Sequence, residues 1–101
     1  MEEKYIKIII DIVERYGKEV QIGQAIEEMA ELTVELNKNI NRKKDNRTEI
    51  ILEIADVAIM LAQLNLIYDV DSDELQGAIE YKLLRQKERM QNDKDIQCMT
   101  D

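Results

Sequence analysis

Residues 50–68 read IILEIADVAIMLAQLNLIY, a stretch that is apolar nearly all the way round a helix. A helix of this composition is expected to be buried on every side. It nevertheless carries Glu53 and Asp56, and at about 100° per residue these acids share one stripe with Glu49 and Gln63. A carboxylate moved into a low dielectric takes up a proton unless a cation or hydrogen-bond donors meet it. The stretch therefore predicts a buried helix whose acids need a partner.

The rest of the chain favours an all-α fold. Among its 101 residues there is no proline and there are three glycines, and 45% of the residues are hydrophobic. Apolar residues recur at helical spacing, which predicts four helices over residues 3–16, 20–41, 50–68 and 73–90. The periodicity ends after the last of these helices, so we expect a single domain over residues 1–91 and a disordered tail over residues 92–101.

The expected protomer resembles a four-helix bundle that assembles with copies of itself. Three amphipathic helices of this size cannot cover a helix that is apolar on all sides, so a second subunit is expected to complete the cover. We therefore predict a homo-oligomer, either a homodimer or a dimer of dimers.

Charge and cysteine content narrow the class of protein. The formal net charge of −8 argues against affinity for nucleic acid or an anionic membrane, because both attract basic surfaces. No wholly apolar run is long enough to span a membrane, and the MEEK start does not resemble a signal peptide. The single Cys98 leaves no internal disulfide, which fits a cytoplasmic location. Without histidine, a metal site would use oxygen ligands and hold Mg²⁺ or Mn²⁺.

A second acidic stripe runs along residues 20–41. Glu28 and Glu31 stand three residues apart and point the same way on a helix, as do Glu53 and Asp56. The short connection over residues 41–47 makes the two helices antiparallel neighbours. Four carboxylates around one space would repel each other, and one or two divalent ions would turn that repulsion into binding. The alternative is that these acids are a solvated face, since 22 acidic residues in 101 produce such pairs by chance.

The other reactive residues and motifs of the chain limit the chemistry that these acids could support. The chain has neither a histidine base nor a glycine-rich phosphate loop, which leaves metal-assisted hydrolysis of a phosphoryl group. Mg²⁺ usually shares its site with substrate phosphates. Lys82, Arg85 and Arg89 form one cationic stripe on the last helix and would neutralise the outer phosphates. Alternatively, these bases pair with Glu80 and Glu88 within the helix.

These residues carry a resemblance to a known family. The sequence EEMAE at residues 27–31, followed by EIAD at residues 53–56, matches the EExxE and ExxD pattern of the MazG-like nucleotide pyrophosphohydrolases. This family belongs to the all-α NTP pyrophosphatase superfamily. The gap between the two halves has the length that the family uses, and the likeness covers residues 16–90.

The resemblance implies Mg²⁺-dependent hydrolysis of a nucleoside triphosphate, or its deoxy form, to the monophosphate and pyrophosphate, with Mn²⁺ as a substitute ion. Carried over by position, the metal ligands would be Glu28, Glu31, Glu53 and Asp56. Glu27 would then be the catalytic helper, either supporting the ligands or acting as the water base.

Some relatives clamp the base between tryptophans, and this chain has none. Base recognition would fall to Gln21, Gln24, Tyr68 or Tyr16. Two alternatives stay open: a phosphoribosyl-ATP-type pyrophosphohydrolase of the same superfamily, and a non-catalytic helical interaction module whose acids bind a basic partner or solvate an oligomer surface.

Overall fold

The computed structural model describes the backbone of residues 1–100 and the side chains of residues 1–94. It contains four helices: α1 (Glu3–Tyr16), α2 (Lys18–Arg42), α3 (Arg47–Ile67) and α4 (Ser72–Thr100). The described residues form no strand, so the predicted all-α class is confirmed.

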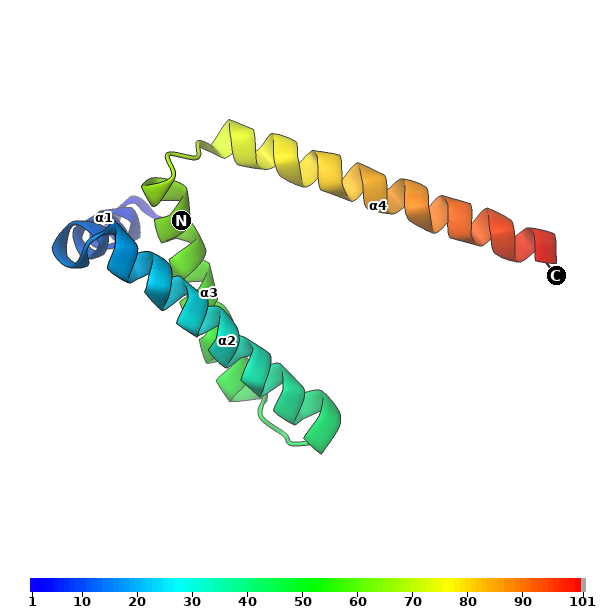
Figure 1. The fold of residues 1–101 in the computed structure, drawn as a ribbon, viewed down its shortest axis with the longest axis horizontal. Coiled ribbons are helices and arrows are strands. Elements are labelled where there is room, and N and C mark those ends of the chain that lie inside the picture. The colour runs from blue at the N-terminus through cyan, green and yellow to red at the C-terminus, as the bar shows by residue number, and fades with distance from the viewer. Residues whose placement is uncertain (101) are drawn as a thin grey trace. The chain divides into compact units, whose positions relative to one another are not determined.

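The chain divides into two units, Met1–Asp69 and Val70–Asp101. In the first unit, α2 and α3 run side by side in opposite directions, and α1 packs against both (Figure 1). The second unit contains α4. The antiparallel arrangement expected for the two acid-bearing helices is therefore present in the first unit, whereas the prediction of one domain over residues 1–91 stays a prediction.

Gly17 separates α1 from α2. Its N–H donates to the carbonyl of Val13 at 2.9 Å and ends α1, while its own carbonyl accepts from the N–H of Gln21 at 3.1 Å and begins α2. The backbone at Gly17 has φ 92° and ψ 155°, which favours glycine because a Cβ is strained there. Gly17 thus ends the helix, and its ψ places it outside the left-handed helical region that many glycine caps adopt.

The connection between α2 and α3 is short and tied to the end of α2. Lys43 adopts the left-handed conformation, and the N–H of Lys44 donates to the carbonyl of Lys38 at 3.2 Å. Asn46 holds the N-cap position of α3 without a side-chain capping bond: its Nδ2 donates to Glu35 on α2, and its Oδ1, the atom that would accept a capping bond, is buried without a partner among the described residues. A contact between helices therefore takes the place of a local side-chain cap at the start of α3.

Helix α4 begins as predicted and continues further. The N–H of Glu74 donates to Asp71 Oδ1 at 2.8 Å, so Asp71 caps the helix. The sequence predicts an end near Met90 and a disordered tail, whereas α4 runs through Thr100. Residues 91–100 contain no glycine or proline to break a helix, and losing the apolar periodicity removes a packing face only. The side chain of Cys98 lies outside the described residues.

The core of the first unit is small. Its buried apolar residues are Ile9, Val13, Ala25 and Met60, and its buried polar residues are Gln21, Asn46 and Gln63. The predicted burial of α3 on every side is not met within this unit, because α1 and α2 leave Leu52 61% and Ile54 51% exposed. A large part of the apolar surface of α3 is therefore open to a further partner.

By length and composition, α3 is also apolar enough to cross a membrane. The core helix of a protein that never meets a membrane can have the same length and composition. The acids Glu53 and Asp56 interrupt its apolar runs.

Candidate metal centre

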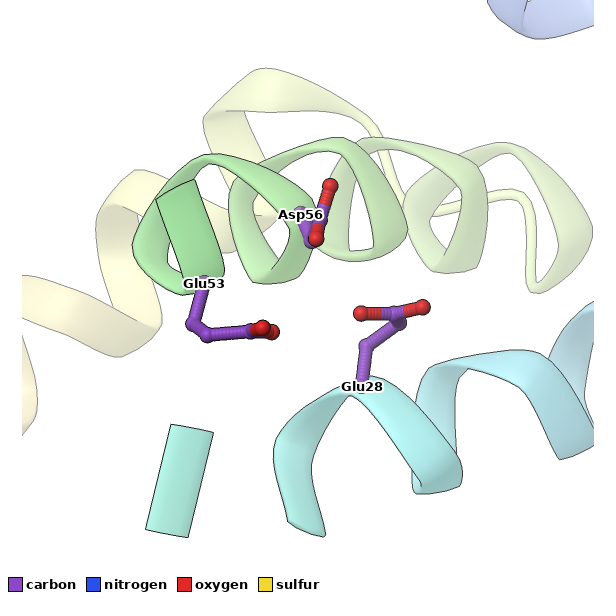
Figure 2. Close-up of side chains that lie close together, drawn as sticks. All are labelled: Glu28, Glu53 and Asp56. Atoms are coloured by element: carbon purple, nitrogen blue, oxygen red, sulfur yellow. The ribbon is translucent and has the colours of Figure 1, made fainter. Parts of the chain in front are cut away.

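Three carboxylates from two helices converge between α2 and α3. Glu28 projects from α2, and Glu53 and Asp56 project from successive turns of α3 toward it (Figure 2). One oxygen atom from each lies within 4.8 Å of the others. The spacing of three residues places Glu53 and Asp56 on one side of α3, and the antiparallel packing places Glu28 opposite them.

Two oxygen atoms of this cluster are buried without a hydrogen-bond partner in the described part of the chain, Glu28 Oε2 and Glu53 Oε2. The other oxygen of Glu28, Oε1, accepts from Gln24 Nε2 at 2.8 Å. A buried acceptor that lacks a donor has lost its hydration without replacement, which is unfavourable. The two orphaned oxygens thus mark a place where a further donor or a cation would be stabilising.

The pKa values of the clustered carboxyls also reflect the lack of donors and cations around them. Burial, followed by repulsion from Glu31, Asp56 and Glu28, raises the pKa of Glu53 above its ordinary value. Burial and the neighbouring Glu28 raise the pKa of Asp56. The ion pairs among the described side chains are Lys4–Glu2 and Lys38–Glu35, and neither neutralises these acids. The cluster is therefore an uncompensated concentration of negative charge.

Glu31 lies beside the cluster. It is exposed, and it is not among the three residues whose oxygens converge. Repulsion from Glu28, followed by partial burial, raises the pKa of its carboxyl, and Asp56 and Glu27 add smaller repulsions. Glu27 is exposed and also outside the converging set. The structure therefore brings three of the four predicted ligands together and leaves the fourth within electrostatic reach.

The donor set suits a hard divalent cation. All of the converging atoms are carboxylate oxygens, which Mg²⁺ and Mn²⁺ prefer, and no sulfur or imidazole is present among them. Mg²⁺ binds through a few carboxylates and keeps the rest of its coordination for water and phosphate. Three carboxylates with two unpartnered oxygens fit that demand.

A hollow of about 310 Å³ lies between α1 and α2, lined by Ile12, Tyr16, Val20, Gln21 and Gln24. Gln24 connects this hollow to the acids through its bond to Glu28. Gln21 is buried, and its Nε2 donates to Gln63 Oε1 on α3 at 2.8 Å. Tyr68 is 62% exposed at the end of α3 and does not line the hollow. Of the residues predicted to bind the base, the hollow thus collects Gln21, Gln24 and Tyr16.

The predicted phosphate-binding residues Lys82, Arg85 and Arg89 lie on α4, in the second unit, and are exposed. The guanidinium of Arg85 lies over the ring of Tyr81, 5.7 Å from its centroid. None of the three forms an ion pair with another described side chain, so the alternative of pairing with Glu80 and Glu88 is wrong for this part of the chain. Their contact with phosphate stays a prediction.

Sequence reasoning missed two polar contacts that flank the acids. Asn46 Nδ2 donates to both the carbonyl and the carboxylate of Glu35, at 2.9 and 2.7 Å, and Gln21 pairs with Gln63. Gln63 falls on the same stripe as the acids, which signals a polar neighbour but not its identity.

No family model, no curated protein and no solved structure matches the chain. The family suggested by the two acidic motifs therefore stays a prediction from those motifs.

Proposed function

We propose that the protein is a Mg²⁺-dependent nucleotide pyrophosphohydrolase of the MazG-like type, which converts a nucleoside triphosphate or its deoxy form to the monophosphate and pyrophosphate. The observation that carries this proposal is the convergence of Glu28, Glu53 and Asp56 within 4.8 Å, with two buried oxygens that have no partner.

In this proposal Glu28, Glu53 and Asp56 hold the ion, and Glu31 completes the set from the next turn of α2. When bound, Mg²⁺ polarises the phosphoryl group and lowers the pKa of water. Glu27 is exposed beside these ligands and would accept the proton of the attacking water, whose oxygen forms the new bond to phosphorus as pyrophosphate leaves. Mn²⁺ would substitute for Mg²⁺, since both take oxygen ligands.

The base of the nucleotide would enter the hollow that Tyr16, Gln21 and Gln24 line. A tyrosine ring offers a stacking surface, and glutamine amides can both donate and accept hydrogen bonds. Because Gln24 also donates to Glu28, base binding and metal binding would share one residue. That Lys82, Arg85 and Arg89 neutralise the outer phosphates stays a prediction from the sequence.

The active form would be a homodimer or a dimer of dimers in the cytoplasm. Its support is the apolar surface of the first unit, where α3 exposes Leu52 and Ile54 and a hollow of about 290 Å³ is lined by Met1, Tyr5, Ile8, Ile9, Ile12 and Ile59. Large exposed apolar surfaces mark sites of association between proteins.

The test is a panel of ribo- and deoxynucleoside triphosphates with Mg²⁺ or Mn²⁺, read as released pyrophosphate. We expect activity on at least one member and a loss of about 100-fold or more in Glu53→Gln, because an amide cannot replace a charged ligand. Glu49→Gln is the matched control, since Glu49 is exposed on the same helix and outside the cluster. Background rates on every substrate would refute the enzyme.

The two alternatives are separated by the same reagents. Phosphoribosyl-ATP in the panel distinguishes a related enzyme that shares the metal site and differs in its pocket. A non-catalytic interaction module predicts no rise in melting temperature with Mg²⁺, because no ion then binds the folded state preferentially.

A further inference from the structure

Two polar contacts between α2 and α3 stand on either side of the candidate metal centre. At one end Asn46, which is 1% exposed, donates to the carbonyl and the carboxylate of Glu35. At the other end the buried Gln21 donates to the buried Gln63. Buried polar contacts of this kind specify one alignment of two helices, because any other alignment leaves the donating amides without acceptors.

The contact between Asn46 and Glu35 lies the same number of residues from the metal centre on α2 and on α3. Glu28 lies seven residues before Glu35 on α2, and Glu53 lies seven residues after Asn46 on α3. Seven residues make about two helical turns, or about 10 Å. Since α2 and α3 are antiparallel, pairing Asn46 with Glu35 brings Glu53 level with Glu28.

The contact between Gln21 and Gln63 has the same spacing from the metal centre, on the opposite side of it. Gln21 lies seven residues before Glu28, and Gln63 lies seven residues after Asp56. On α2 the three meetings with α3 thus recur every two turns, and on α3 each outer meeting lies two turns from the nearer acid, with the acids in the middle. A slip of α3 by one residue would move its acids about 1.5 Å along the axis and turn them by about 100°.

We propose that Asn46 is a positioning residue of the metal centre: by binding Glu35 it fixes the register of α3 along α2, and so the separation of Glu28 from Glu53 and Asp56. This inference rests on the proposed function, because it assumes that these carboxylates bind an ion. Metal ligands must lie within a few tenths of an ångström of their places, so a small change of register is sufficient to weaken binding.

Glu35 acts here as the partner of Asn46 and not as a fifth ligand. Both of its carboxylate oxygens are occupied, Oε2 by Asn46 and Oε1 by Lys38 Nζ at 3.2 Å. Those two bonds hold the pKa of Glu35 below its ordinary value, in contrast to the raised pKa of Glu53. Glu35 therefore has a hydrogen-bond partner for each carboxylate oxygen, whereas Glu28 and Glu53 each keep one buried oxygen without a partner in the described chain.

The experiment measures the affinity for Mn²⁺ by isothermal titration calorimetry, at a temperature where circular dichroism shows each variant to be folded. We expect Asn46→Ala to bind Mn²⁺ about tenfold more weakly than the wild type, the low end of the effect that removing outer support has in other metal sites. Asn41→Ala is the matched control, because Asn41 is exposed and its side chain bonds to Asn37 within α2. It should bind Mn²⁺ as the wild type does.

Variants of Glu35 keep the inference testable if Asn46→Ala does not fold. Glu35→Gln retains an oxygen that can accept from Asn46, so it should keep the wild-type affinity, whereas Glu35→Ala should weaken Mn²⁺ binding about threefold. A folded Asn46→Ala with wild-type affinity would overturn the positioning role, and so would a Glu35→Gln as weak as Glu35→Ala. Wild-type protein that binds no Mn²⁺ would instead refute the metal centre, and both proposals would fall.

Discussion

Gln63→Leu should destabilise the folded protein because it leaves Gln21 without its hydrogen-bond acceptor. Gln63 is 2% exposed and Gln21 is 7% exposed, and they share a hydrogen bond of 2.8 Å. Leucine fills a similar volume and removes the acceptor, which leaves the Gln21 amide buried without a partner. An unsatisfied buried donor costs about 1–3 kcal/mol, so we expect a loss of this size in the free energy of unfolding.

The double variant Gln21→Leu/Gln63→Leu should recover most of that loss. Replacing both partners of a buried hydrogen bond with apolar groups of the same shape is nearly neutral. The single variants should therefore each melt lower by about 4–8 °C for every kcal/mol lost, and the double variant close to the wild type. Their energies will not add, because the two side chains contact each other.

The assay is urea unfolding followed by circular dichroism at one fixed protein concentration, because association with a second copy would make stability depend on concentration. Gln86→Leu on α4 is the control for the residue exchange, since Gln86 is exposed. A double variant that loses as much as the two single variants combined would show that the hydrogen bond is not the source of the effect. A higher KM for nucleotide in a fully stable double variant would assign Gln21 to base binding.

Three further predictions concern the acids and the apolar surface. Mg²⁺ at about 100 times its dissociation constant should stabilise the wild type by about 2.7 kcal/mol, or about 10–20 °C in a melting curve referred to EDTA, and should not stabilise Glu53→Gln. The folded state of the metal-free protein retains protons that the unfolded chain has released, since the pKa of Glu53 and of Asp56 is raised, so its stability should fall as pH rises above 4.5, the ordinary value for Glu53. Urea titrations from about pH 5 to about pH 8 would measure that fall, and a slope of the opposite sign would contradict the raised values. Leu52→Lys places a charge on the exposed apolar face of α3, and sedimentation velocity should show a smaller species than the wild type; an unchanged coefficient would exclude this face from the association site.

Much of the first unit could be predicted because its signals are local. The three- and four-residue spacing of apolar side chains predicts residues 3–16 as a helix, and α1 has the same bounds. The matching spacing of Glu28 with Glu31 and of Glu53 with Asp56 predicts that the acids meet, and three of the four do. A short connection between two helices leaves little freedom in how they pack.

The features that sequence reasoning missed depend on contacts between helices. Asn46 stands at the N-cap of α3, where Oδ1 would accept a bond from the first turn, but its side chain is turned so that Nδ2 donates to the carboxylate and carbonyl of Glu35. The Gln21–Gln63 pair depends on the register of α2 and α3, which composition does not reveal. The sequence predicts that α3 is buried on every side, whereas Leu52 is exposed in the structure. A pattern of apolar residues indicates that they need cover but does not state which chain will cover them.

The contrast among the three meetings of α2 with α3 argues for a cation. At the outer two positions the polar groups have donors and acceptors that complement each other, Asn46 with Glu35 and Gln21 with Gln63. At the middle position acid faces acid, and Glu28 and Glu53 each keep a buried oxygen without a donor in the described chain. A solvated acidic face would turn those oxygens to water. Asn46 Oδ1 is also buried without a partner, but it is a neutral amide oxygen, whereas the centre gathers three carboxylates, and this concentration of charge fits a site that a divalent ion completes.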